Sequence, residues 1–379
     1  MARKRDEVVL DPMAGSGTTI VSARQRGYRA IGFDTDPLAV LIATVWSENL
    51  DGEKVKLAAD RVLRAAKQSC SLMRPDAAYP AGADEDTRKF IRFWFDERCR
   101  QQLTALQSAI RRHQGKAIQR VLFCALSRLV ITKKYGVSKA MDVSHSRPHR
   151  VYDQAPITPF EQFLKAVSHI VKTAPFKNQE SAPRATVRRA DARALPQQDE
   201  SIDAVITSPP YLHAIDYMRG HKLSLVWMGY SVKDLRVIRS TNVGAHSMSK
   251  APNGRDLIEV MGSMGAINEL SGQQQGMVRR YVEDLTKVVA ECSRVLRKNG
   301  RATFVAANSN VSGISVSNSK AIELLAERSG LRLKAIRSRE INDQHRYLPA
   351  PRRESAGPIL QNRMREEFIM TFQKASPKK

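Results

Sequence analysis

The stretch between residues 7 and 37 constrains the fold more than any other part of the sequence. Glu7-Val8-Val9-Leu10 predicts a buried strand, and helical spacing follows from residue 18. A second strand ends in Asp34, and Asp36-Pro37 then begins another helix with capping chemistry. The loop after the first strand is Asp11-Pro12-Met13-Ala14-Gly15-Ser16-Gly17-Thr18-Thr19. This order of strand, glycine loop, helix, strand and acid is typical of a nucleotide-binding α/β fold.

The chemistry of this loop favours one class of ligand. Gly15 and Gly17 permit positive φ and a close approach of the backbone to a ligand, and Asp34 can accept from both hydroxyls of a ribose. The glycine spacing is not the dinucleotide fingerprint, and no lysine follows as in a phosphate-binding loop. Asp11 at the head of the loop would repel a polyphosphate. S-adenosylmethionine, a cationic adenosyl ligand without phosphate, therefore fits better than NAD or ATP.

A second stretch carries a different chemistry. Thr207-Ser208-Pro209-Pro210-Tyr211 follows the strand-like run 202–206. Each proline fixes its φ and has no N–H to donate, so the carbonyls are held stiffly. A short hydroxyl side chain, rigid carbonyls and an aromatic ring can hold a planar amino group and stack on the ring that carries it. An ordinary proline turn at a strand end is the alternative for this motif taken alone.

The amino-acid composition limits the kinds of partner that the chain is expected to bind. The 379 residues include 62 Lys and Arg and 38 Asp and Glu, a formal net charge of +24 that favours nucleic acid. No run of eighteen apolar residues and no signal sequence is visible, so we expect no membrane partner and a cytoplasmic, nucleoid-associated location. The four cysteines are scattered without a ligand pattern, so we expect no metal site.

The α/β pattern is interrupted and then resumes. Residues 51–180 are mainly helical and basic, whereas strand-plus-acid spacing returns at 186–191, where Asp191 and Ala192 end a strand. We expect 1–50 and 181–379 to form one α/β domain and 51–180 to be a helical insertion, with recognition of nucleic acid either in this insertion or in residues 231–275. A polar stretch, 231–275, predicts a mobile loop over the site. Further strands are expected at 301–306, 331–337 and 368–372, and a helix at 281–296.

Two features of the insertion concern nucleic acid. The basic residues around 132–151 favour a loop that contacts DNA or RNA phosphates, and the alternative is a solvated basic loop without such contacts. The candidate phosphate-binding residues are Lys133, Lys134, Arg147 and Arg150. Phe90, Phe93 and Trp94 fall on one face of a predicted helix over 86–111, which favours packing rather than platforms for bases.

Taken together, the two motifs make this sequence resemble the amino-group DNA methyltransferases. The loop 11–19 is similar to their cofactor motif, with Met13 where phenylalanine is usual, and 207–211 is similar to their catalytic motif. Asp34 and Asp191, with Ala192 beside it, fall where the family binds ribose and adenine. The resemblance covers about 7–50 and 185–372. It implies a Rossmann-like, seven-stranded sheet with helices on both faces and an antiparallel final strand.

The resemblance also implies an activity. A methyl group would pass from S-adenosylmethionine to an exocyclic amino group of a base flipped out of double-stranded DNA, as in restriction-modification systems. Ser208 favours cytosine N4. The alternatives are adenine N6, an RNA amino group, and a non-catalytic nucleic-acid-binding subunit.

Two structural expectations follow from the resemblance. The family's helix before the glycine loop is missing here, so either a C-terminal segment completes the cofactor pocket, or a partner chain or dimer does, or the chain begins late. The prediction that the protein is an enzyme also requires the glycine loop and the double-proline turn to lie side by side at one edge of the sheet.

Overall fold

The computed structural model describes residues 6–130, 135–141, 148–176, 183–212, 216–244, 254–340 and 366–375, and its chain divides into two compact units. The sheet unit comprises Met1–Thr35, Pro183–Ala214 and Ser240–Lys379, and the helical unit comprises Asp36–Ala182 and Ile215–Arg239. Residues 36–50 and 215–239, which we expected in the α/β domain, group with the helical unit because α2 and α8 pack on α6 of that unit.

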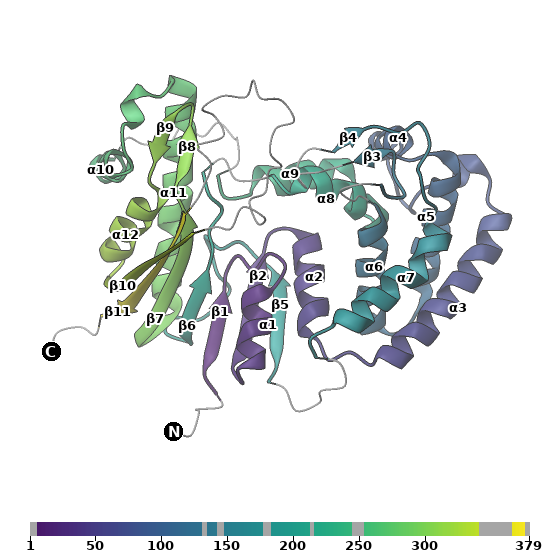
Figure 1. Ribbon diagram of the computed structural model, residues 1–379, viewed down its shortest axis with the longest axis horizontal. Helices are drawn as coiled ribbons and strands as arrows, with labels where there is room; N and C mark the ends of the chain where they lie inside the picture. Colours follow the sequence, from purple (N-terminus) through teal and green to yellow (C-terminus); the bar gives the residue numbers. More distant parts are fainter. Residues whose placement is uncertain are drawn as a thin grey trace. The chain divides into compact units, whose positions relative to one another are not determined.

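The sheet unit is built on one seven-stranded sheet (Figure 1). In spatial order its strands are β10 (Leu331–Glu340), β11 (Glu366–Lys374), β7 (Leu296–Ala307), β6 (Ile202–Thr207), β1 (Val8–Asp11), β2 (Arg29–Asp34) and β5 (Ala185–Arg189). Pairings from β5 through β2, β1 and β6 to β7 are parallel, whereas β11 is antiparallel to both β7 and β10. The expected Rossmann-like sheet with an antiparallel final strand is confirmed.

Alternation along β1 explains why helices cover both faces of this sheet. Val9 belongs to a small core with Ile20 and Ala23 of α1 (Thr18–Gln25). Its neighbour Leu10 points the other way, into the larger core that includes Leu285 of α11 (Gly272–Val295). Figure 1 shows α11 and α12 (Asn318–Arg328) beside β7, and α1 against β1 and β2. A strand buried on both faces requires the continuous apolar run seen at its sequence position.

The stretch 231–275 differs from its prediction as a loop. It contains α9 (Val232–Ser240), α10 (Arg255–Ser263) and the 3₁₀ turn η3 (Ile267–Glu269), while 245–253 lies outside the described residues. Val232, Leu235 and Ile238 recur at helical spacing and are buried, a short pattern hidden by its polar background. The helix predicted at 281–296 begins earlier, at Gly272, because Ser271 and Gln274 form a capping box. The hairpin β8 (Ser309–Val311) and β9 (Ile314–Val316) completes the unit.

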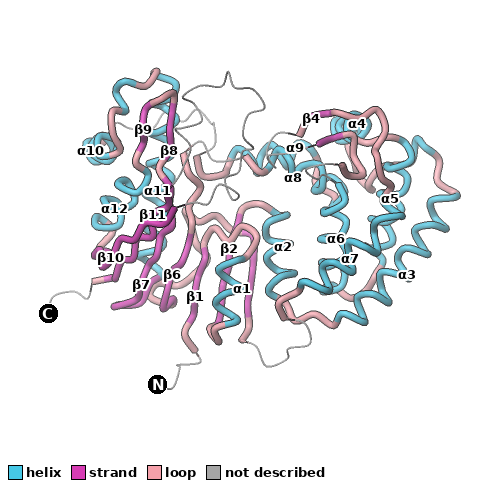
Figure 2. Tube along the Cα trace, in the orientation of Figure 1, coloured by secondary structure: helices cyan, strands magenta, loops and turns pink. Residues whose placement is uncertain are grey.

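The helical unit has its own apolar core, and Figure 2 shows it as mostly helix with one short strand pair. Within this core the rings of Phe95 and Trp227 pack edge to face, with their centres 5.1 Å apart. The helix predicted over 86–111 is broken beside Phe95, because Asp96 caps a new helix by accepting from the Cys99 amide at 2.9 Å.

The helices, 3₁₀ turns and strands of the helical unit are α2 (Pro37–Ser47), α3 (Gly52–Ser71), η1 (Pro75–Ala77), α4 (Glu85–Trp94), α5 (Glu97–Arg112), α6 (Lys116–Val130), β3 (Ala140–Met141), β4 (His149–Arg150), α7 (Pro159–Thr173), α8 (Met218–Leu225), η2 (Val226–Met228) and the helix α9 given above. Within the described part of the chain, none of the helices has both the length and the apolar composition needed to cross a membrane.

Two isoleucines of the sheet unit provide a matched test of its core. Ile322 in α12 is fully buried, whereas Ile336 in β10 is 45% exposed. We expect Ile322→Ala to lower the free energy of unfolding by about 2–5 kcal/mol, since it leaves a cavity. Ile336→Ala should cost less than about 1 kcal/mol. Urea unfolding followed by circular dichroism measures both, and equal losses would contradict the packing described above.

Candidate active site

The two sequence motifs meet at the carboxyl ends of adjacent strands. β1 and β6 are parallel neighbours, with Val9 opposite Ala204 and Leu10 opposite Val205. Just beyond this register, the Thr207 hydroxyl donates to Asp11 Oδ1 at 2.8 Å. Parallel strands bring their carboxyl ends to the same edge of a sheet, which is where ligands of such folds bind. The expectation that the glycine loop and the double-proline turn lie side by side at one edge is confirmed.

The glycine loop is folded tightly against the end of β2. Gly15 and Gly17 have φ of 51° and 88°, left-handed values that glycine adopts without a steric penalty. The Ala14 amide donates to the Phe33 carbonyl at 2.8 Å, and the Gly15 amide donates to Asp34 Oδ2 at 2.9 Å. A side chain added at Gly15 would meet no atom within 4 Å. The loop is therefore packed on its inner side and open on its outer side.

Asp11 stands behind the loop rather than on its open side. It is buried, and its Oδ1 also accepts from the Met13 amide at 3.1 Å. Burial raises the pKa of Asp11 above its ordinary value, although hydrogen bonds from Thr19, Thr207 and the Met13 amide oppose the shift. These contacts are all to the protein itself, so the carboxyl ties the glycine loop, α1 and β6 together.

The two acids expected to hold a ligand both accept hydrogen bonds from groups of the protein itself. Asp34 ends β2 and supports the Gly15 amide. Asp191 binds Arg193, whose Nη2 and Nε donate to its two oxygens at 2.7 and 3.0 Å. Burial raises the pKa of Asp191, but the hydrogen bonds and charge of Arg193 outweigh it and hold the pKa below its usual range. The same guanidinium donates to Asp284 at 2.6 Å, so Asp191 is anchored to α11.

Ser208 is exposed at the end of β6 with its hydroxyl oriented by the neighbouring strand. Its Oγ donates to the Val305 carbonyl at 3.0 Å. If that bond uses the only hydroxyl hydrogen, the Ser208 oxygen acts as an acceptor, with the Tyr211 hydroxyl 3.5 Å away. Pro209 is buried, and its carbonyl has no hydrogen-bond partner among the described residues. Two acceptor oxygens thus lie on consecutive residues of the turn.

Tyr211 does not present a fully exposed ring for stacking. The ring is partly buried against the larger sheet-unit core, and its hydroxyl donates to Glu367 Oε1 in β11 at 3.2 Å. Burial is the main cause that raises the pKa of Tyr211 to about 12. Glu367 is itself paired with Arg339 at 2.5 Å. The phenol is therefore held neutral and in one orientation.

The remaining candidates fall into three groups. Pro12, Met13 and Ser16 lie in the glycine loop, Thr18 and Thr19 begin α1, and Ala192 is buried after Asp191. Lys133, Lys134 and Arg147 lie outside the described residues. Arg150 lies in β4 of the helical unit, with its guanidinium 5.6 Å from the Phe93 ring centre and 3.5 Å from Asp153. Among the described residues, no group of three or more His, Cys, Asp or Glu is placed to hold a metal ion.

Sequence reasoning missed several partners of these residues. Arg193 is only two positions from Asp191, so an acid followed at that spacing by arginine was a readable signal for a local ion pair. Glu367 lies 156 residues from Tyr211, and the Val305 carbonyl is a backbone group. Neither left a signal in the sequence, because each depends on how β7 and β11 pair.

The burial of Asp11 gives a test based on pH. Asp11→Asn removes the titration and leaves one oxygen to accept from Thr207 and Met13. Because the pKa of Asp11 is raised in the folded state, the unfolded chain releases this proton first as the pH rises above about 4. We therefore expect the free energy of unfolding of the wild type to fall relative to Asp11→Asn between pH 4 and pH 7, measured by urea titration. Asp60→Asn serves as the control, and a pH-independent difference would contradict the assignment.

Comparison with known proteins gives relatives of one kind. No family model matches the chain. The type II methyltransferase M.BsoBI of Geobacillus stearothermophilus is 23% identical over 65% of this chain and 52% of its own length. M.MvaI of Kocuria varians is 22% identical over 81% of this chain and 71% of its own length. M.AvaI of Nostoc sp. is 22% identical over 88% of this chain and 75% of its own length. The chain thus spans about half of the length of M.BsoBI.

Among solved structures, a SAM-dependent methyltransferase of Methanosarcina mazei aligns over 98% of this chain and 94% of its own, at 9% identity and a TM-score of 0.34. The fold assignment rests on the strand order and pairing given above rather than on this likeness. The sequence matches and the two motifs agree, and the chain is similar to type II methyltransferases.

Proposed function

We propose that this protein is a DNA methyltransferase that moves a methyl group from S-adenosylmethionine to an exocyclic amino group of a base. The observation that carries the proposal is the hydrogen bond between Thr207 and Asp11, which holds the glycine loop beside the Ser-Pro-Pro-Tyr turn. An adenosyl ligand on the loop and an amino group at the turn would then be neighbours. The similar proteins M.BsoBI and M.MvaI are type II methyltransferases, which supports the same reaction class.

The residues present fit an adenosyl cofactor. The open outer side of Gly15 admits a ligand close to the backbone, and Asp34 ends the neighbouring strand as a carboxylate. We assign the ribose to Asp34 and the adenine to the region of Asp191 and Ala192. When bound, S-adenosylmethionine supplies an electrophilic methyl group on a sulfonium. The loop 11–19 positions the ligand through backbone groups, while Asp11 acts behind it as a positioning residue.

The turn is suited to activating an amine. An exocyclic amino group is a poor nucleophile because its lone pair is delocalised into the ring. Hydrogen bonds from its two N–H groups to Ser208 Oγ and the Pro209 carbonyl would draw the nitrogen toward tetrahedral geometry and localise that pair. Ser208 is prepared for this role because it gives its own hydrogen to Val305. Catalysis then rests on positioning and on fixed dipoles.

Tyr211 and Pro210 complete the turn. A target base must leave the duplex before its amino group can reach Ser208, and it needs an apolar surface to rest on. We assign that surface to the ring of Tyr211 and to Pro210. The bond from the Tyr211 hydroxyl to Glu367 fixes the ring plane, so the phenol acts by position and not as an acid or base.

The target atom is proposed as cytosine N4. Ser at the first position of the catalytic motif favours cytosine by resemblance, and adenine N6 is the second candidate. An RNA amino group and a non-catalytic binding subunit are the remaining alternatives. The intact glycine loop, the acids and the oriented Ser208 favour an enzyme over a binding subunit.

Double-stranded DNA is the proposed partner, and the net charge of +24 supplies the attraction. The sheet unit carries catalysis in this proposal, and the helical unit carries recognition. Lys133, Lys134, Arg147 and Arg150 are proposed phosphate contacts. With DNA as the substrate, we further propose a cytoplasmic, nucleoid-associated location and a role in a restriction-modification system. A partner chain or dimer that completes the cofactor pocket remains part of the proposal.

Replacement of Ser208 tests the proposed chemistry. Ser208→Ala removes one acceptor for the amino group, and we expect the methyl-transfer rate to fall about 10²-fold or more while S-adenosylmethionine binding is unchanged. Ser201→Ala is the matched control, because Ser201 also donates to a carbonyl, that of Gln198 at 2.7 Å. Rates from tritiated cofactor and affinities from calorimetry separate the two effects. Full activity of Ser208→Ala would refute the mechanism.

The product identifies the base. DNA from a host that expresses the protein, digested to nucleosides, should contain N4-methylcytosine by mass spectrometry and no excess of N6-methyladenine. DNA from a host expressing Ser208→Ala is the control. N6-methyladenine alone would move the assignment to the second candidate, and modified nucleosides found only in RNA would overturn the DNA proposal.

A further inference from the structure

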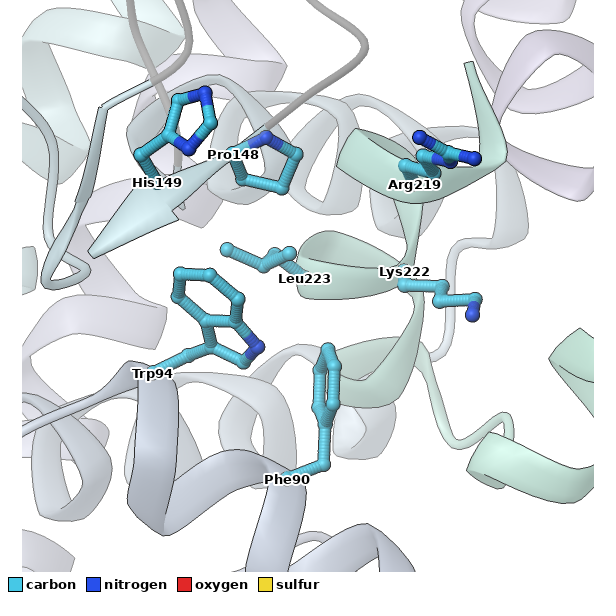
Figure 3. A pocket seen from close by; sticks show the side chains of 7 residues that line it. All are labelled: Phe90, Trp94, Pro148, His149, Arg219, Lys222 and Leu223. Atoms are coloured by element: carbon cyan, nitrogen blue, oxygen red, sulfur yellow. The ribbon is translucent and has the colours of Figure 1, made fainter. Parts of the chain in front are cut away.

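A pocket in the helical unit is lined by both aromatic and cationic side chains. Its volume is about 400 Å³, within the range of about 300–1,000 Å³ typical of small-molecule sites. The residues that line it come from α4, from β4 and the position before it, and from α8, and they are Phe90, Trp94, Pro148, His149, Arg219, Lys222 and Leu223 (Figure 3). All of them belong to one compact unit, so the pocket is formed by that unit alone.

The apolar wall of the pocket is formed by rings. Phe90 and Trp94 lie one helical turn apart on α4, with ring centres 6.3 Å apart and planes inclined by 58°. Both rings pack against the core of the helical unit, as the sequence pattern predicted, and both are only partly buried, so part of each ring is exposed. Pro148 lies opposite Trp94, and Leu223 is buried beneath them. Flat, partly exposed rings are the surfaces on which unstacked bases rest.

The other wall is cationic. Lys222 is half-buried on α8, and it has no ion-pair or hydrogen-bond partner among the described residues. Burial lowers the pKa of Lys222, and the nearby Arg239, Arg236 and Arg219 lower it further, with Asp216 opposing.

The carboxylate nearest to this wall, that of Asp216, already forms ion pairs with arginines. Arg219 and Arg239 share Asp216, at 3.2 and 2.6 Å, so two arginines are matched by one carboxylate. An anion beside Lys222 would relieve this excess of positive charge.

We propose that this pocket binds one unstacked nucleotide of the DNA strand, with its base on Trp94 and Phe90 and its phosphate at Lys222 and Arg219. The inference rests on the proposed function only in taking DNA as the partner. An acidic peptide would use the cations but not the rings, whereas a nucleotide uses both. None of the residues assigned to this contact is shared with the turn proposed to hold the base that receives the methyl group.

Binding of fluorescein-labelled oligo(dT), measured by anisotropy, tests the base contact. Trp94→Ala should weaken binding about tenfold, Trp94→Phe should retain most of it, and neither should change binding to an oligonucleotide of the same length with abasic sites. Equal losses on oligo(dT) and on the abasic strand would overturn the base contact, and so would an unchanged Kd for Trp94→Ala. Oligo(U) binding more tightly than oligo(dT) in a Trp94-dependent way would assign the pocket to RNA instead.

The phosphate contact has its own control. Lys222→Met keeps the apolar stem and should flatten the salt dependence of oligo(dT) binding by roughly 0.7 in log–log slope. Lys67→Met, an exposed lysine of α3 in the same unit, should leave the slope unchanged. An unchanged slope for Lys222→Met would overturn the contact. This variant also decides the outcome if Trp94→Ala does not fold by circular dichroism.

Methyl transfer by the wild type is measured in parallel. If the wild type methylates DNA and Trp94→Ala binds oligo(dT) normally, the pocket proposal fails and the proposed function stands. If the wild type binds oligo(dT) through Trp94 but transfers no methyl group to any DNA, the proposed function fails and the pocket proposal stands.

Discussion

The hydrogen bond from Thr207 to Asp11 is the contact on which the candidate site depends. It joins the ends of two parallel strands that are far apart in the sequence, and it lies in a buried environment, where a hydrogen bond is stronger than in water. Met13 and Thr19 bind the same carboxyl, so the glycine loop, α1 and the double-proline turn are positioned by one side chain. Without this hydrogen bond, no side-chain contact of Asp11 would hold the end of β6 against the glycine loop.

Preorganisation in this site comes from groups that are already paired. Asp34 supports the Gly15 amide, Asp191 is clamped by Arg193, and Ser208 gives its hydrogen to the strand beside it. A ligand therefore meets side chains whose orientation has been set before it arrives, which lowers the entropic cost of binding. In the proposed site, a ribose or adenine would have to share acceptor oxygens that already accept from a protein donor.

Charge and aromatic surface are distributed differently between the two units. The sheet unit places carboxylates and neutral hydroxyls at the ends of its strands, whereas the pocket of the helical unit combines rings with Lys222 and Arg219. Long-range attraction to a polyanion needs only net charge, but retention of one nucleotide needs a shaped surface. This division suits a protein in which one unit performs chemistry and another holds the strand.

The sequence by itself determined the strand, glycine loop and acid order, the turn at Ser208 and the return of the α/β pattern near 185, because each depends on residues close together along the chain. The helices within 231–275 escaped prediction, since Val232, Leu235 and Ile238 form too short a pattern to stand out. Only the tertiary structure decided that Tyr211 would be held by Glu367 and that α4 rings would face Lys222. Those contacts arise from strand pairing and helix packing across long separations, which no local spacing records.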